Sequence, residues 1–112
     1  MLFDPKTSGP SGGLMQTLYV YSKVFGKDLT YGRKIAGTGS IDINGNVGEI
    51  GGISQKVITA FRNNADCFIC PMDNSKEGYA TYKSIKGHEK MDFIIVETLS
   101  DAISELGRLY EN

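Results

Sequence analysis

The sequence predicts an α/β domain in which a mixed sheet packs against helices. Strand-like runs rich in β-branched and aromatic residues alternate with apolar residues at helical spacing through the second half of the chain. Before them, the dipeptide Asn44-Gly45 separates two strand-like runs and indicates a β-hairpin. Each later connection is long enough for a helix, which is typical of parallel neighbouring strands. We expect one domain, residues 1–112, with a β-hairpin followed by alternating helix and strand.

The first quarter of the chain predicts a strand end, a loop and a helix. Residues 1–4 resemble the end of a strand, and residues 5–13 form a loop with three glycines and two prolines. Gly26 ends the helix that follows. One face of that helix carries apolar residues at i, i+4, i+7 and i+11, namely Leu14, Leu18, Tyr21 and Phe25.

The middle of the chain predicts the hairpin and a second helix. A strand over residues 35–43 leads through the turn to a strand over residues 47–50. After Gly51-Gly52, an apolar stripe predicts a helix that ends near Asn63-Asn64. Lys56 lies beside this stripe, so we expect its side chain to be partly buried. The stripe consists of Ile53, Val57, Ala60 and Phe61.

The last third continues the alternation. We expect strands over residues 67–71 and 93–96, and helices over residues 76–85 and 100–109. Asn74-Ser75 introduces the first of these helices. Ser100 is the expected N-cap of the second, with Asp101 and Glu105 early in the helix.

Composition excludes several classes of function. Twelve Lys and Arg residues against 13 Asp and Glu residues leave no basic excess for a nucleic-acid partner. The apolar runs are far shorter than the ~20 residues that a membrane helix needs, and no signal peptide is expected at the start. His88 lies in the polar run 86–90, which favours a solvated surface residue over a catalyst.

The two cysteines form a C-x-x-C pattern, Cys67 to Cys70, inside a run that reads as a buried strand. Residues three apart in a strand point to opposite faces, so this pair cannot bind one metal ion or join in a disulfide there. Zinc also needs four ligands, and His88 is the only histidine. Structural thiols are therefore favoured over a redox or zinc site, and no metal is expected.

Ser11 lies where the glycine-rich loop meets the first helix, so its hydroxyl and the nearby backbone N–H groups can face one point. A serine needs a base to remove its proton, and a lysine serves as that base only if burial lowers its pKa toward neutrality. Lys56 is the candidate base. Loops of this kind also serve turns or bind phosphate, but this one lacks the Gly-Lys-Ser/Thr ending of a P-loop.

Four blocks in order carry a family resemblance: residues 9–13 (Gly-Pro-Ser-Gly-Gly), 36–41 (Ala-Gly-Thr-Gly-Ser-Ile), 45–52 (Gly-Asn-Val-Gly-Glu-Ile-Gly-Gly) and Gln55-Lys56. Together they resemble the proteolytic domain of Lon proteases. The nearest resemblance is to the membrane-anchored Lon-like proteases of Gram-positive bacteria, which carry a PDZ domain and no ATPase. It runs from about residue 8 to 106 and covers the C-terminal part of that domain, whose first strands are expected upstream of Met1. A small-molecule kinase family with a related fold is disfavoured, because its Ser-Ser loop is missing.

The resemblance implies a serine endopeptidase that works without ATP, metal or cofactor. Ser11 would be the nucleophile and Lys56 the general base, with the Thr38 hydroxyl orienting the lysine and the backbone N–H groups of Ser11 and Gly12 forming the oxyanion hole. Gly12 replaces a common alanine, and Ser8 stands where the family often has an acidic residue.

The resemblance also implies protein or peptide substrates and a homo-oligomer. A membrane anchor and a PDZ domain are expected outside this chain. The residues themselves do not indicate a compartment; the resemblance implies the extracytoplasmic face of a bacterial membrane, or the cytoplasm for a true Lon protease. The alternative is an inactive fragment that acts in oligomer assembly.

Overall fold

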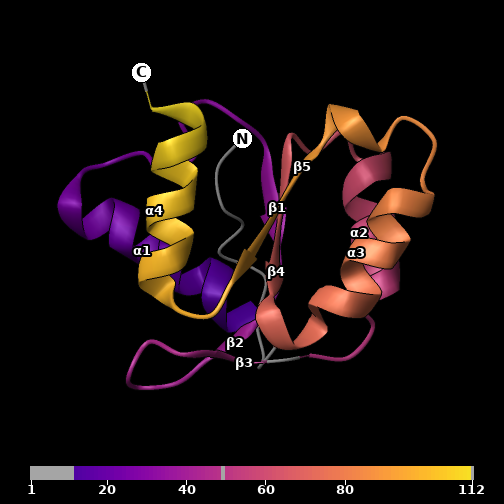
Figure 1. Cartoon of the computed structure of the whole chain (residues 1–112). Coiled ribbons are helices and arrows are strands. Elements are labelled where there is room, and N and C mark those ends of the chain that lie inside the picture. Colours follow the sequence, from indigo (N-terminus) through magenta and orange to yellow (C-terminus); the bar gives the residue numbers. More distant parts are fainter. Residues whose placement is uncertain (1–11, 49, 112) are drawn as a thin grey trace.

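A parallel three-stranded sheet forms the centre of the computed structural model, which describes residues 12–48 and 50–111. Strands β1 (Ile35–Gly37), β4 (Cys67–Pro71) and β5 (Asp92–Val96) lie in the order β1-β4-β5. Both strand pairs are parallel, with Ile35 opposite Cys67 and Cys67 opposite Asp92. Helices cover both faces, which gives the three layers visible in Figure 1. The expected α/β fold is confirmed.

The four expected helices are present within one or two residues of their predicted bounds. They are α1 (Gly13–Phe25), α2 (Ile53–Arg62), α3 (Ser75–Ser84) and α4 (Leu99–Tyr110). Gly26 ends α1 in the left-handed region, at φ 62°, as predicted. Helices α1 and α4 lie on one side of the sheet, and α2 and α3 on the other (Figure 1). The strand expected over residues 1–4 lies outside the described residues.

Strand β4 supplies side chains to two separate apolar clusters, because its five residues are all buried. Cys67 and Ile69 pack with α1 and α4, whereas Phe68 and Cys70 pack with α2 and α3. The two thiols are free and lie on opposite faces of the sheet, as the sequence predicted. Burial raises the pKa of each thiol to about 12.

The continuous strand predicted over residues 35–43 is wrong, because the chain leaves the parallel sheet at Thr38-Gly39. It forms β1 and then a separate strand, β2 (Ser40–Ile41). Gly39 has φ 148°, which other residues rarely adopt, and an added Cβ there would lie 2.9 Å from Cγ1 of Val47. This glycine allows one segment to serve two sheets.

The predicted hairpin is confirmed, although its second strand is shorter than expected. Strand β2 pairs antiparallel with β3 (Val47–Gly48), and the connecting loop is held by the Asp42 carboxylate. Asp42 Oδ1 accepts the N–H groups of Asn44 and Asn46, each at 2.9 Å. The Val47 N–H then donates to the Glu97 carbonyl oxygen at 2.8 Å, which attaches the hairpin to the segment after β5.

The N-cap predicted for the last helix is wrong by two residues. Thr98, not Ser100, caps α4: the Thr98 hydroxyl accepts the Asp101 N–H at 3.1 Å, and the Asp101 carboxylate accepts the Thr98 N–H at 3.1 Å. This reciprocal capping box needs a side-chain acceptor at the third helical position, which Asp101 supplies to Thr98.

His88 is more enclosed than its polar neighbours predicted. It begins the short 3₁₀ turn η3 (His88–Lys90), and its ring packs edge-on against Tyr82 with centroids 4.8 Å apart. Across the described residues, Nδ1 of His88 is buried without a hydrogen-bond partner. None of the helices in these residues is both long enough and apolar enough to cross a bilayer.

Candidate active site

Helix α2 carries Lys56 at the edge of its buried face. Gly52 precedes the helix with φ 72°, a conformation that suits glycine, and Lys56 makes the first helical hydrogen bond, from its N–H to the Gly52 carbonyl oxygen at 3.2 Å. Ile53 and Val57 are buried against the sheet, and Lys56 is half-buried beside them. The predicted partial burial of Lys56 is confirmed.

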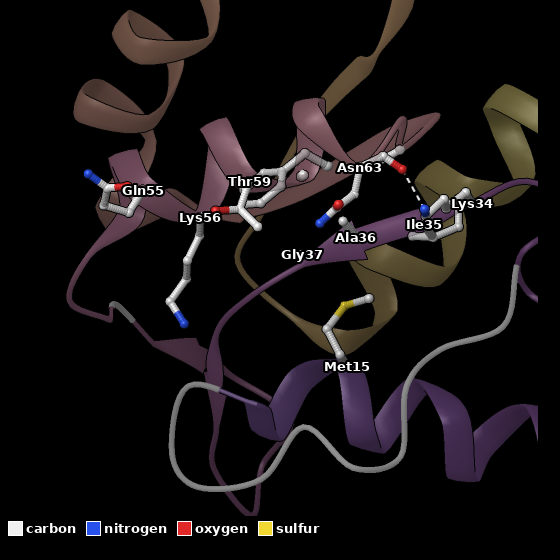
Figure 2. Close-up of a pocket in the computed structure, with 12 residues that line it drawn as sticks. Met15, Lys34, Ile35, Ala36, Gly37, Gln55, Lys56, Thr59 and Asn63 are labelled. Atoms are coloured by element: carbon white, nitrogen blue, oxygen red, sulfur yellow. Dashed lines mark hydrogen bonds between the residues drawn. The ribbon is translucent and has the colours of Figure 1, made fainter.

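A pocket of about 470 Å³ lies beside Lys56. Residues of α2, β1, α1 and β4 line it, among them Lys56 of α2, Gly37 of β1 and Met15 of α1 (Figure 2). The Lys56 side chain extends away from α2, toward the side of the pocket on which α1 lies. The lining residues are Met15, Lys34, Ile35, Ala36, Gly37, Gln55, Lys56, Thr59, Ala60, Asn63, Ala65 and Phe68.

The start of α1 is tied to the chain just after β1. The Leu14 N–H donates to the Gly39 carbonyl oxygen at 2.9 Å, and Met15 lies so close to Gly37 that an added Cβ there would be 3.0 Å from its sulfur. Thr38, which is 2% exposed, lies between these two contacts and donates its N–H to the Ile69 carbonyl oxygen at 3.2 Å. The beginning of α1 is thereby fixed next to the Thr38 backbone.

The structure therefore places part of the predicted site. Gly12 is buried and immediately precedes α1, and Thr38 follows the pocket residue Gly37. Ser11 lies outside the described residues. The hydrogen bond expected between the Thr38 hydroxyl and Lys56 stays a prediction, as do the roles of Ser11 and Gly12.

The charge around Lys56 differs from that of an ordinary surface lysine. No carboxylate lines the pocket among the residues that the structure describes. The second lysine in the lining is Lys34, whose ammonium group donates a hydrogen bond to the Asn63 carbonyl oxygen. The rest of the lining is apolar or neutral. Among the described lining residues, Lys56 therefore has no carboxylate partner in the pocket.

Sequence reasoning missed one residue that lines this pocket and one that bonds the chain just before α2. Met15 was not among the expected buried residues of α1, because only positions 14, 18, 21 and 25 fitted the stripe; its 5% exposure places it in the core. Asn74 was predicted only to introduce a helix, yet its side chain bonds the Ile50 backbone, 24 residues away. No local pattern in the sequence indicates a contact of that length.

The fold and the pocket define a three-layer α/β domain in which a helical lysine shares a pocket with the first turn of α1. Residues 4–107 match the family described as the Lon protease (S16) C-terminal proteolytic domain. The chain belongs to this family, so the family expected from the sequence motifs is confirmed.

Individual relatives agree. The chain is 32% identical over 95 residues to Lon protease of Clostridium acetobutylicum, with 85% of this chain and 12% of that protein covered. It is 30% identical over 95 residues to Lon protease 1 of Bacillus subtilis, with the same coverage. A match to the mitochondrial Lon protease homolog of Drosophila melanogaster is 38% identical over 69 residues, or 62% of this chain and 6% of that protein. The chain thus spans a small part of these relatives.

Proposed function

We propose that this chain hydrolyses peptide bonds with Ser11 as nucleophile and Lys56 as general base. The observation that carries the proposal is the pocket that Lys56 shares with Met15, which lies only four residues after Ser11. Because the Leu14 N–H is bonded to Gly39, the chain enters α1 close to that pocket. Membership of a family of proteolytic domains supports the same chemistry.

In the proposed reaction, Ser11 Oγ attacks the carbonyl carbon of the scissile peptide while its proton moves to the Lys56 amine. The tetrahedral intermediate collapses when the C–N bond breaks and the Lys56 ammonium gives that proton to the leaving amine. Water then attacks the acyl-serine ester and loses a proton to Lys56. The acid leaves, and Ser11 recovers its proton from Lys56, so the lysine ends the cycle as it began.

The start of α1 suits it to hold the oxyanion. Within the described residues, Gly12 makes no side-chain cap and the first turn of this 13-residue helix carries no acidic side chain. The Leu14 N–H is already used by Gly39. The proposed donors are the N–H groups of Gly12 and Ser11, as the family resemblance implies. Thr38 is proposed to orient the Lys56 amine through its hydroxyl.

The proposed reaction needs no ATP, metal or cofactor, because this chain supplies both the nucleophile and the base. The sequence also lacks the Gly-Lys-Ser/Thr ending of a P-loop. The substrates proposed are exposed segments of partly unfolded proteins, since a folded backbone cannot enter the pocket. The compartment stays a prediction with two alternatives, the extracytoplasmic face of a bacterial membrane or, for a true Lon protease, the cytoplasm.

The test is covalent labelling by a fluorophosphonate, which reacts with activated serines. We expect Ser11→Ala to abolish labelling and Lys56→Arg to slow it by orders of magnitude, because arginine does not give up its proton. Matched controls are Ser100→Ala, at an exposed position of α4, and Lys83→Arg, at an exposed position of α3; both should label like the parent. Labelling of Lys56→Arg at the parent's rate would refute the dyad.

Assembly is the second candidate role, and exposed apolar groups favour it. Ile43, at the tip of the hairpin, is 100% exposed, and Val24 and Phe25 at the end of α1 are each about two-thirds exposed. Strand β1 also has no partner on its outer edge among the described residues, and an open edge is a template for pairing. Light scattering across concentration tests this role: oligomers weakened by Ile43→Ser support it, and a monomer at every concentration contradicts it.

A further inference from the structure

The side chain of Asn74 holds both backbone polar groups of Ile50. Its Oδ1 accepts the Ile50 N–H at 2.9 Å, and its Nδ2 donates to the Ile50 carbonyl oxygen at 2.9 Å. Asn74 lies in the turn η2 (Met72–Asn74), directly after β4, and Ile50 lies between the hairpin and α2. One side chain therefore replaces the neighbouring strand that Ile50 lacks.

These two hydrogen bonds between Asn74 and Ile50, the Asn74 clamp, lie just before the helix that carries Lys56. Only Gly51 and Gly52 separate Ile50 from α2, and neither has a side chain to fix the direction of the chain. Gly51 is exposed and an added Cβ there would meet nothing within 4 Å, so no packing holds it. The direction in which the chain enters α2 consequently depends on Ile50 and its clamp.

The clamp reaches Lys56 through the first helical hydrogen bond. The Lys56 N–H donates to the Gly52 carbonyl oxygen, whose orientation follows from how the two glycines leave Ile50. We propose that Asn74 is a positioning residue for Lys56: by fixing Ile50, it fixes the first turn of α2 and so the place of the Lys56 amine in the pocket. This inference rests on the proposed function for its catalytic consequence, but not for its structural one.

Other contacts of α2 act on a different part of the helix. Ile53 and Val57 are buried, and the Ser54 hydroxyl bonds Glu77 and Thr81 of α3 at 2.8 Å each. These contacts hold α2 against α3, and none of them restrains the two glycines that precede it. Ser54 therefore provides a matched control. It makes two side-chain hydrogen bonds in the first turn of α2, and neither involves Gly51 or Gly52.

The test compares Asn74→Ala, Asn74→Asp and Ser54→Ala in the full 112-residue chain. Amide hydrogen exchange reports the Lys56 N–H, and labelling of amines with acetic anhydride, measured by mass spectrometry, reports the Lys56 side chain relative to exposed Lys83. Loss of two hydrogen bonds in Asn74→Ala should speed exchange at Lys56 by about tenfold and labelling by at least about threefold. Asn74→Asp keeps the acceptor and loses the donor, so its exchange rate should be intermediate. Ser54→Ala should stay within about twofold of the parent.

Unchanged exchange and labelling at Lys56 in Asn74→Ala would overturn the inference, and so would equal changes in Ser54→Ala. The fluorophosphonate reaction gives the catalytic readout: Asn74→Ala should label Ser11 at least about tenfold more slowly, with a changed dependence on pH, whereas a protein that loses stability alone keeps the parent's pH profile. Where Lys56→Arg labels slowly, normal labelling of Ser11 in Asn74→Ala alongside disturbed exchange also overturns the positioning role. If Lys56→Arg itself labels normally, the proposed function fails while the exchange data still decide whether Asn74 places Lys56.

Discussion

Gly37 offers the sharpest test of how the pocket is built, because its missing side chain lets β1 approach β4. An added Cβ would lie 2.8 Å from Ile69 Cβ, 2.9 Å from the Ile69 carbonyl oxygen and 3.0 Å from the Met15 sulfur. Two of these three atoms belong to the buried central strand and cannot move aside cheaply. Gly37→Ala must therefore separate the two strands or shift the start of α1.

The size of the effect follows from two opposing terms. Overpacking a well-packed core by one methyl group costs roughly 1–3 kcal/mol. The backbone of Gly37 is outside the left-handed region, so alanine also lowers the entropy of the unfolded chain and stabilises the fold by about 0.4–1 kcal/mol. The net expectation is a loss of about 1–2 kcal/mol in the free energy of unfolding. For a domain of this size, that loss lowers Tm by roughly 4–12 °C.

The assay is urea and thermal unfolding followed by circular dichroism, with Gly51→Ala as the matched control. An added Cβ at Gly51 meets nothing within 4 Å, and this residue too has an ordinary φ, so only the entropy term remains. Gly51→Ala should leave stability unchanged or raise it slightly. If the unfolding free energy of Gly37→Ala is within about 0.5 kcal/mol of the parent's, β1 is not packed against Ile69 as described, and the pocket is not built on this contact.

Two further predictions concern the buried strand and the last helix. Because burial raises the pKa of Cys67 and Cys70 from 9.0 to about 12, both thiols should resist iodoacetamide at pH 8 in the folded chain and react fully in denaturant. Because the folded state favours the neutral thiols, their contribution to the free energy of unfolding is complete below about pH 9. Between about pH 9 and 12 it falls by up to about 1.4 kcal/mol per thiol for each pH unit. Urea unfolding at a series of pH values measures this loss. Thr98→Ala should lower the free energy of unfolding by about 1 kcal/mol, because the capping box is lost, whereas Ser100→Ala at the predicted but incorrect cap should change it by less than about 0.5 kcal/mol. Equal effects at Thr98 and Ser100 would contradict the assigned cap.

The helices were predictable because each carries its own local pattern. The stripe of Ile53, Val57 and Ala60 located α2 within a residue, and burial of all three follows from their spacing. Strand β4 was equally clear, since a short apolar run that is bounded by polar and turn-forming residues is typical of a buried strand. The half-burial of Lys56 followed from its place beside the stripe.

The features that were missed depend on contacts between distant residues. Gly39 suits the break because of its φ of 148° and because Val47, eight residues away, crowds the position where a side chain would be. The cap at Thr98 could be recognised only by pairing Thr98 with Asp101 three residues later. Ser100 is also a hydroxyl residue that commonly caps helices, so residue type alone does not distinguish it from Thr98. The clamp of Asn74 on Ile50 joins segments 24 residues apart, for which the sequence contains no periodic signal.

The two-sided burial of β4 has a consequence for how the molecule unfolds. Its odd and even residues belong to different apolar clusters, so neither helical layer can separate from the sheet without exposing side chains of the same strand. The layers should therefore unfold as a single cooperative unit, with the slowest amide exchange in the chain at residues 67–71. The loop of the hairpin, residues 42–46, contributes no side chain to either cluster, so its amides should exchange faster and without that global event.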